Sequence, residues 1–224
     1  MARPVNDSLP GRLPWAAAPW LKDAVPKRYD PKDFYYRKAK KEGLRARSAF
    51  KIEEIAERFR LLRPGMAILD LGAAPGGWLQ VMADQVGDRG LVIGVDLVPI
   101  APIAKRHVKT AVLDIREPDF EARLAELHPG KFDLVTSDMA PKTMGIKDVD
   151  ETRSLELSEL ALQTAKKTLK PGGSFVCKVF MGSGFEGYLK QVKAAFARTK
   201  VMRPEATRDR SYEHYVVGIG LRGG

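Results

Sequence analysis

The chain has one cysteine, three histidines and no long apolar run among its 224 residues, and each shortage excludes a class of protein. A lone cysteine, Cys177, excludes an internal disulfide and fits a reducing compartment. Because Cys177 stands in an apolar strand pattern, we expect a buried side chain rather than a nucleophile. The histidines are scattered, so no metal site is expected. No apolar run approaches the roughly 18 residues of a membrane helix, and the opening residues form no signal-peptide core. We therefore expect a cytoplasmic protein that binds no membrane.

Positive charge is in excess and is concentrated at the beginning of the chain. The formal charge is +10, from 38 basic and 28 acidic residues. Residues 1–51 contain 13 basic and 5 acidic residues and so carry +8. Tyr29, Phe34, Tyr35 and Tyr36 stand among these cations. Cations gather phosphates and aromatic rings can stack on bases, so the pattern favours a polyanionic partner over a merely solvated basic face.

The first quarter of the chain divides into a proline-rich segment and two helical patterns. Residues 1–28 contain five prolines and are expected to be an extended N-terminal segment, followed by a single domain over 29–224. A basic helix is expected at 31–43. A second helix, capped by Ser48, follows from apolar residues at helical spacing and runs until the Pro-Gly pair at 64–65.

From there strand and helix patterns alternate, which predicts an α/β fold with a Rossmann-like arrangement. We expect a mainly parallel, seven-stranded sheet with helices on both faces. Its last two strands lack an intervening helix, so we expect them to be antiparallel. The predicted strands span 67–71, 91–96, 109–113, 132–137, 174–180, 200–203 and 213–220. A monomer is the simplest expectation for a domain of this size.

The run DLGAAPGGW at 70–78 is the strongest single signal. Its small residues let the chain turn sharply and approach a bound molecule, and the helix at 80–86 presents its N-terminus there. Asp96 ends the next strand 20 residues after Gly76. A carboxylate in that position accepts hydrogen bonds from a ribose, so the pattern indicates a nucleoside cofactor.

The glycine loop also discriminates between cofactors. A dinucleotide fingerprint has a second glycine that admits a pyrophosphate, whereas this chain has Ala74 there and Asp70 before the loop. That arrangement resembles motif I of methyltransferases that use S-adenosylmethionine (SAM). A nucleotide-dependent oxidoreductase on the same topology, or a plain tight strand–helix junction, is the alternative.

Four charged residues stand at unusual positions, either at the end of a predicted strand or within an apolar stretch. Asp138 follows the strand at 132–137, and Glu213 opens the last strand. Lys178 lies inside an apolar strand and Lys51 on the apolar side of a helix. A buried lysine is costly without a partner. Singly, each has an ordinary interpretation as a solvated, turn-forming or snorkelling residue.

Four stretches together carry a family resemblance. They read GLRARSAFK at 43–51, LDLGAAPGGW at 69–78, SDMAP at 137–141 and PGGSFVCKVF at 171–180. With them, the chain from about residue 30 onward resembles the FtsJ/RrmJ family of RNA ribose 2′-O-methyltransferases, in particular its bacterial members that act on large-subunit ribosomal RNA. The proline-rich residues 1–28 differ from those members.

The resemblance implies a set of site residues. Asp96 would hold the ribose hydroxyls of SAM and Asp114 the adenine amine, while Trp78 either packs near the cofactor or fills the core. Lys178 would accept the proton, or, if charged, orient the ribose 2′-oxygen. The implied catalytic residues are Lys51, Asp138, Lys178 and Glu213, and the cofactor-binding residues are Gly72, Gly76, Gly77, Trp78, Asp96, Asp114 and Asp138.

The implied reaction is methyl transfer from SAM to a ribose 2′-hydroxyl, with a uridine of large-subunit ribosomal RNA as the expected target during ribosome maturation. Transfer RNA, a messenger cap, or a non-catalytic role in ribosome assembly are the alternatives. The partner is RNA and not DNA, because only RNA has the 2′-hydroxyl. Residues expected to bind it are Lys38, Lys40, Lys41, Arg45, Arg47, Arg208 and Arg210.

Overall fold

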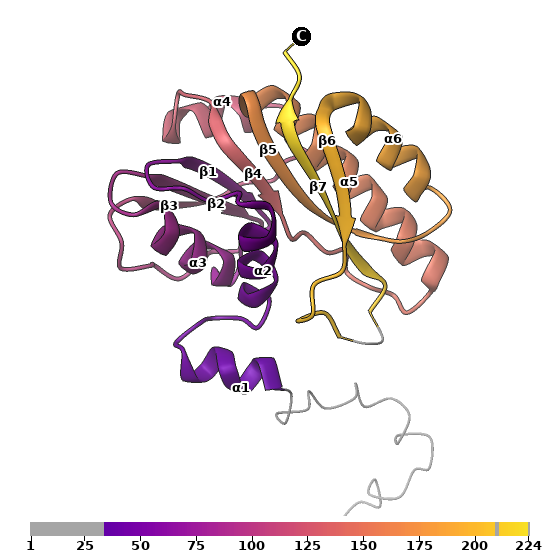
Figure 1. The fold of residues 1–224 in the computed structure, drawn as a ribbon, viewed down its shortest axis with the longest axis horizontal. Helices are drawn as coiled ribbons and strands as arrows, with labels where there is room; N and C mark the ends of the chain where they lie inside the picture. The colour runs from indigo at the N-terminus through magenta and orange to yellow at the C-terminus, as the bar shows by residue number, and fades with distance from the viewer. Residues whose placement is uncertain (1–33, 209–210, 224) are drawn as a thin grey trace, which may run out of the picture. The chain divides into compact units, whose positions relative to one another are not determined.

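A computed structural model describes residues 34–208 and 211–223 (Figure 1). The predicted N-terminal segment 1–28 and Arg210 lie outside these residues. The helices are α1 (Phe34–Lys41), α2 (Ala49–Phe59), α3 (Gly77–Val86), α4 (Phe120–Leu127), α5 (Lys147–Thr168) and α6 (Phe185–Ala195). The strands are β1 (Ala67–Leu71), β2 (Leu91–Asp96), β3 (Val108–Val112), β4 (Phe132–Ser137), β5 (Leu169–Phe180), β6 (Phe196–Met202) and β7 (Glu213–Leu221).

The strands form one seven-stranded sheet in the order β3-β2-β1-β4-β5-β7-β6. Strands β1 to β5 are parallel, whereas β7 runs antiparallel to both β5 and β6. The expected α/β sheet, including its antiparallel last pair, is therefore confirmed. The final strand, β7, inserts between β5 and β6, so residues near the C-terminus lie next to β5 inside the sheet.

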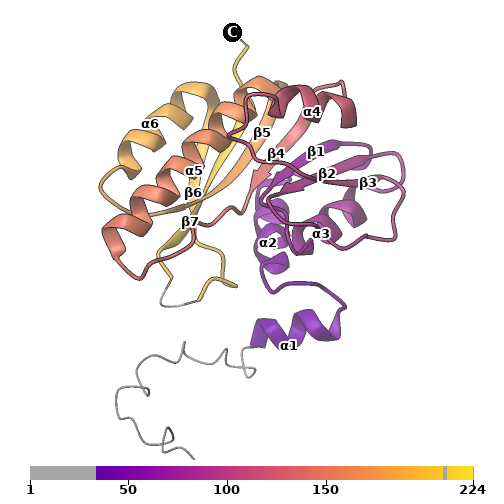
Figure 2. The same cartoon turned by 180° about the vertical axis from the view of Figure 1, so that it is seen from behind.

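Helices cover both faces of the sheet, and each face has its own apolar core. Helices α2 and α3 lie on one face, and α4, α5 and α6 lie on the other (Figures 1 and 2). Alternate residues of β1 serve the two cores: Ile68 packs on the α2–α3 side and Leu69 on the α5 side. A strand that is buried on both faces has a continuous apolar sequence. For this reason the sequence predicts the bounds of β1, β2 and β4 correctly.

Two strands begin several residues before their predicted starts. The structure extends β5 back to Leu169, where it pairs with Phe132, although 171–173 read Pro-Gly-Gly. A Cβ at Gly173 would lie 2.9 Å from the Lys170 carbonyl oxygen, so this close backbone approach requires glycine. Strand β6 begins at Phe196 rather than at residue 200. Its first residues are missed by the sequence pattern because an exposed edge strand shows little apolar alternation.

The predicted helix boundaries also need correction. Ser48 does precede α2, but its side chain makes no capping bond within the described residues, because its own backbone is already helical (φ −62°, ψ −18°). Helix α2 ends at Phe59, before the expected Pro-Gly pair, since Arg60 adopts a left-handed conformation with φ 54°. Helix α3 begins at Gly77, three residues before the predicted start at Gln80.

Candidate active site

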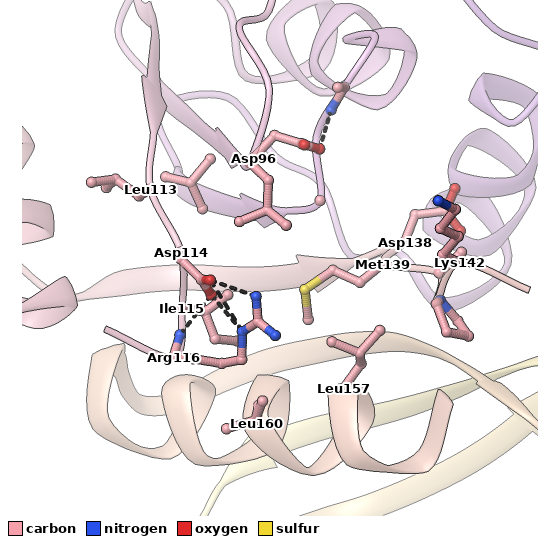
Figure 3. A pocket seen from close by; sticks show the side chains of 16 residues that line it. Asp96, Leu113, Asp114, Ile115, Arg116, Asp138, Met139, Lys142, Leu157 and Leu160 are labelled. Atoms are coloured by element: carbon pink, nitrogen blue, oxygen red, sulfur yellow. Dashed lines mark hydrogen bonds and ion pairs between the residues drawn. The ribbon is translucent and has the colours of Figure 1, made fainter. Parts of the chain in front are cut away.

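A pocket of about 390 Å³ lies at the carboxyl edge of the parallel strands (Figure 3). Asp96 ends β2, Asp114 follows β3 and Asp138 follows β4, and all three line it. Ligands of open α/β sheets bind at this edge, and the volume suits a nucleoside-sized molecule. Apolar side chains complete the lining: Leu113, Ile115, Met139, Leu157 and Leu160.

The glycine loop after β1 needs its small residues for contact with the neighbouring loop. Gly72 has φ 75°, and a Cβ there would lie 2.6 Å from Met139 Cγ. Asp96 ties two loops together: one carboxylate oxygen accepts the Ala74 N–H at 2.9 Å and the other the Val98 N–H at 3.1 Å. The glycine loop and Asp96 at the end of β2 therefore form one backbone cradle, in which each Asp96 oxygen retains acceptor capacity.

Asp114 is held as a carboxylate by its neighbour. The Arg116 guanidinium donates to both of its oxygens, with Nη2 2.6 Å from Oδ2. The hydrogen bond from Arg116 is the main reason that the pKa of Asp114 lies below its ordinary value. A carboxylate at this position can accept a hydrogen bond from an exocyclic amine.

Of the seven predicted cofactor-binding residues, the structure brings four to this pocket: Gly72, Asp96, Asp114 and Asp138. Gly76 and Gly77 turn the chain beside the pocket and pack against Arg45 and Ala46 rather than lining it. Trp78 is 3% exposed in the core, and its indole N–H donates to the Ser48 carbonyl at 2.8 Å. Trp78 is thus part of the core, and its predicted place near the cofactor stays a prediction.

The four predicted catalytic residues form two ion pairs. Lys51 Nζ lies 2.6 Å from Glu213 Oε2, and Lys178 Nζ lies 3.1 Å from Asp138 Oδ1. Lys178 also donates to the Asp138 backbone carbonyl at 2.6 Å. Both lysines are buried, at 7% and 5% exposure, so each buried cation has the partner that its burial requires.

Tyr215 joins the two pairs, and sequence reasoning missed it. Its hydroxyl donates to Asp138 Oδ1 at 2.7 Å, and its ring centroid lies 5.7 Å from Lys51 Nζ. Burial, and then the charge of Asp138, raise the pKa of Tyr215 well above 10, so it remains a hydroxyl donor. A signal existed, because Tyr215 stands two residues after Glu213 and hence on the same face of β7, directly opposite Lys178.

A second pocket, of about 520 Å³, lies beside the first. Lys51, Glu213 and Ser211 line it, together with Ser48, Arg47 and Arg208. Asp138 lines both pockets. The buried ion pairs therefore stand at the junction of a nucleoside-sized pocket and a cavity with basic walls.

The residues predicted to bind RNA have different surroundings. Arg47 and Arg208 line the second pocket, while Lys40 and Lys41 are exposed on α1. Lys38 lies over the Phe50 ring, 4.3 Å from its centroid.

Arg45 is bonded to the protein backbone. Its guanidinium donates to the backbone carbonyls of Pro75, Ala101 and Pro102. These bonds link the segment before α2 to the glycine loop and to the loop after β2. Arg45 therefore holds two loops together. These three bonds use N–H donors that are then not available to a phosphate.

Asp70 is fully buried below the glycine loop. The Thr136 hydroxyl donates to Oδ1 at 2.6 Å, but Oδ2 has no partner among the described residues. Burial, against the lowering effect of the Thr136 bond and with a smaller contribution from the charges of Asp138 and Asp96, raises the pKa of Asp70 to about 8. Asp70 is therefore a neutral acid at neutral pH, which makes its burial tolerable.

Residues 34–208 and 211–223 contain no group of three metal-binding side chains and no helix long and apolar enough to cross a membrane. Cys177 is free and fully buried, as expected.

A parallel sheet with a nucleoside-sized pocket at its carboxyl edge, beside paired lysines and carboxylates, defines a group-transfer enzyme with a nucleoside cofactor. The chain matches the FtsJ-like methyltransferase family over residues 44–221 and belongs to that family. It is therefore a methyltransferase.

Relatives and solved structures agree with this assignment. The chain is 61% identical over 196 residues to ribosomal RNA large subunit methyltransferase E of Anaeromyxobacter sp. (strain Fw109-5), covering 88% of this chain and 71% of that protein. It is 57% identical to the protein of the same name from Myxococcus xanthus (strain DK1622), covering 88% and 92%. A Plasmodium falciparum crystal structure described as a ribosomal RNA methyltransferase has a TM-score of 0.71 at 25% identity, covering 80% of this chain and 100% of the other.

Proposed function

We propose that this methyltransferase transfers a methyl group from S-adenosylmethionine to a ribose 2′-hydroxyl in large-subunit ribosomal RNA, with uridine as the modified nucleoside. One observation carries the proposal: Asp138 lines both pockets and binds Lys178, so an acceptor in the basic pocket meets a cofactor in the acidic one at the ion pairs. The names of the relatives support ribosomal RNA as the substrate.

The first pocket suits the cofactor chemically. Asp96 would accept hydrogen bonds from the ribose hydroxyls, and Asp114 would accept one from the adenine amine. Leu113, Ile115 and Met139 offer apolar surface for the adenine ring. Bound SAM supplies a methyl group on a cationic sulfur, and Asp138 adds negative charge to the pocket wall.

Lys178 is the residue that would accept the 2′-hydroxyl proton. Paired with Asp138 it is an ammonium, so it must first release a proton to act as the base; the resulting amine would keep two N–H bonds to Asp138 and have one lone pair for the 2′-hydroxyl proton. Asp138 then lies beside the ammonium that forms and stabilises it. Lys51 is held by Glu213 and keeps a second positive charge near the developing alkoxide.

Much of the rate enhancement should come from positioning. The acceptor oxygen must lie in line with the bond that breaks, beside two lysines that are themselves buried. Lys51, Lys178 and Glu213 lie on α2, β5 and β7, whereas Asp138 directly follows the end of β4.

The RNA would lie across the basic rim of the second pocket, where Arg47 and Arg208 are placed to meet phosphates. Lys40 and Lys41 are exposed on α1 and would add positive charge for the RNA. We further propose a monomer that acts in the cytoplasm, on RNA and not on DNA or a membrane.

The test is incubation with labelled SAM and separated cellular RNA fractions, followed by nuclease digestion and identification of the labelled nucleoside. We expect label in large-subunit ribosomal RNA as 2′-O-methyluridine. Label in transfer RNA or cap structures would refute the substrate, and another methylated nucleoside would refute uridine. The absence of label in every fraction would refute the activity and favour a non-catalytic assembly factor.

A further inference from the structure

A third pocket, of about 640 Å³, lies at the end of the sheet opposite the active site. Asp133 at the start of β4 and Lys170 to Ser174 at the start of β5 line it, and the C-terminal end of α2 contributes Arg58 and Arg60. These are the amino ends of the parallel strands. Since β1 has five residues and β4 has six, this pocket lies roughly 17–20 Å from the catalytic edge at about 3.3 Å per residue.

The walls of this pocket carry positive charge that the protein itself does not neutralise. Asp133 is its one acidic residue, and Lys170 lies 2.9 Å from both Asp133 oxygens. That ion pair leaves four arginines, which we call the arginine pocket: Arg58, Arg60, Arg63 and Arg198.

The arginine side chains are free to meet a ligand. All four arginines are exposed. Within the part of the chain that the structure describes, none of them forms an ion pair or a side-chain hydrogen bond, and Arg58 Cζ lies 5.9 Å from the centroid of the Phe59 ring. They come from α2, from the turn before β1 and from β6, so three separate segments bring the charge to one cavity.

We propose that the arginine pocket binds the phosphate backbone of the RNA substrate at a second point, remote from the methylated ribose. Guanidinium groups bind phosphate oxygens in pairs, and four of them around one cavity suit a run of phosphates better than a single anion. The pocket opens on the edge opposite the active site. An RNA segment there is therefore distinct from the one whose ribose is methylated, which requires a large folded RNA. The identity of that RNA as ribosomal rests on the proposed function.

The test compares two triple variants of the full chain. The patch variant is Arg58→Gln, Arg63→Gln and Arg198→Gln; Arg60 is kept because its left-handed backbone ends α2. The control variant removes the same charge from exposed positions on α5 and α6, as Lys166→Gln, Lys190→Gln and Lys193→Gln. Thermal unfolding verifies that both variants are folded.

Binding is measured by filter retention of labelled whole large-subunit ribosomal RNA between about 50 and 200 mM KCl. The patch variant should bind about 10- to 100-fold more weakly near physiological salt, and its log–log salt slope should fall by about 2 to 3. The control variant should keep the slope of the wild type. Both should bind and methylate equally well a short hairpin that contains only the mapped target nucleotide and its neighbours.

Equal affinity and slope of the patch variant and the wild type on whole RNA would overturn the proposal. So would an equal loss in the control variant, or an equal loss on the short hairpin, because either would show an effect of net charge alone. The binding assay does not depend on methyl transfer, so a failure of the proposed activity is distinguishable from a failure of this pocket.

Discussion

Removal of the Tyr215 hydroxyl is the sharpest test of how the site is organised. That hydroxyl donates to Asp138 Oδ1 at 2.7 Å inside the protein, and the same oxygen lies 3.1 Å from Lys178 Nζ. A hydrogen bond to a charged group contributes about 1.5–3 kcal/mol. If Tyr215→Phe loosens Asp138 by that amount, and the loss appears in the transition state, kcat falls by about 10- to 150-fold.

The assay follows methyl transfer from labelled SAM to ribosomal RNA under saturating conditions, with calorimetry for SAM affinity. Tyr215 does not line the cofactor pocket, so SAM affinity should change by less than the rate does. The matched control is Tyr188→Phe, which removes a buried hydroxyl beside Cys177 on the other face of the sheet. That variant should retain kcat even if it loses stability.

Wild-type kcat in a folded Tyr215→Phe protein would refute the reasoning, because Asp138 would then need no support from the hydroxyl. An equal loss in the Tyr188→Phe protein would show that kcat follows stability rather than the position of Asp138.

Three further predictions concern single carboxylates and the base. Lys178→Ala should abolish methyl transfer and leave SAM affinity nearly intact in calorimetry; near wild-type turnover would end its assignment as the base. Asp96→Ala should weaken SAM binding in the same instrument, and unchanged affinity would exclude it from the cofactor site. The third concerns Asp70, whose pKa of about 8 in the native protein keeps a proton that the unfolded chain releases near pH 4. The native state therefore binds more protons, and the free energy of unfolding should fall by up to about 1.4 kcal/mol per pH unit between roughly pH 4 and 8. Asp70→Asn should flatten the slope in urea unfolding, whereas the exposed control Glu126→Gln should keep it; parallel slopes in all three proteins would contradict a neutral Asp70.

The sheet was predictable where burial dictates the sequence pattern. Strands β1, β2 and β4 are buried on both faces and have the expected bounds, because apolar runs of that length have few other uses. The edge strand β6 and the Pro-Gly-Gly start of β5 were not predictable. Their pairing depends on partners distant in sequence, which override the local preference against strands.

The residues of the site were predictable, but their pairing was not. The motifs indicate Lys51, Asp138, Lys178 and Glu213, yet which lysine meets which acid depends on the register of β5 with β7 and on the position of α2. Tyr215 was missed because an aromatic residue in an apolar strand ordinarily fills core. Only the register shows that it stands opposite Lys178.

Asp138 also has an internal asymmetry that explains how one acid can serve two pockets. Its Oδ1 accepts from Tyr215 and Lys178, whereas within residues 34–208 and 211–223 no side chain or backbone N–H donates to its Oδ2. Its backbone carbonyl holds Lys178 as well, and its N–H donates to the Leu71 carbonyl at 3.2 Å, which fixes it beside the glycine loop. One oxygen thus orients the lysine, and the second keeps acceptor capacity, which our proposal assigns to a cationic ligand in the neighbouring pocket. Since both oxygens belong to one planar carboxylate, the proposed site couples the position of Lys178 to the charge presented to the cofactor through covalent geometry.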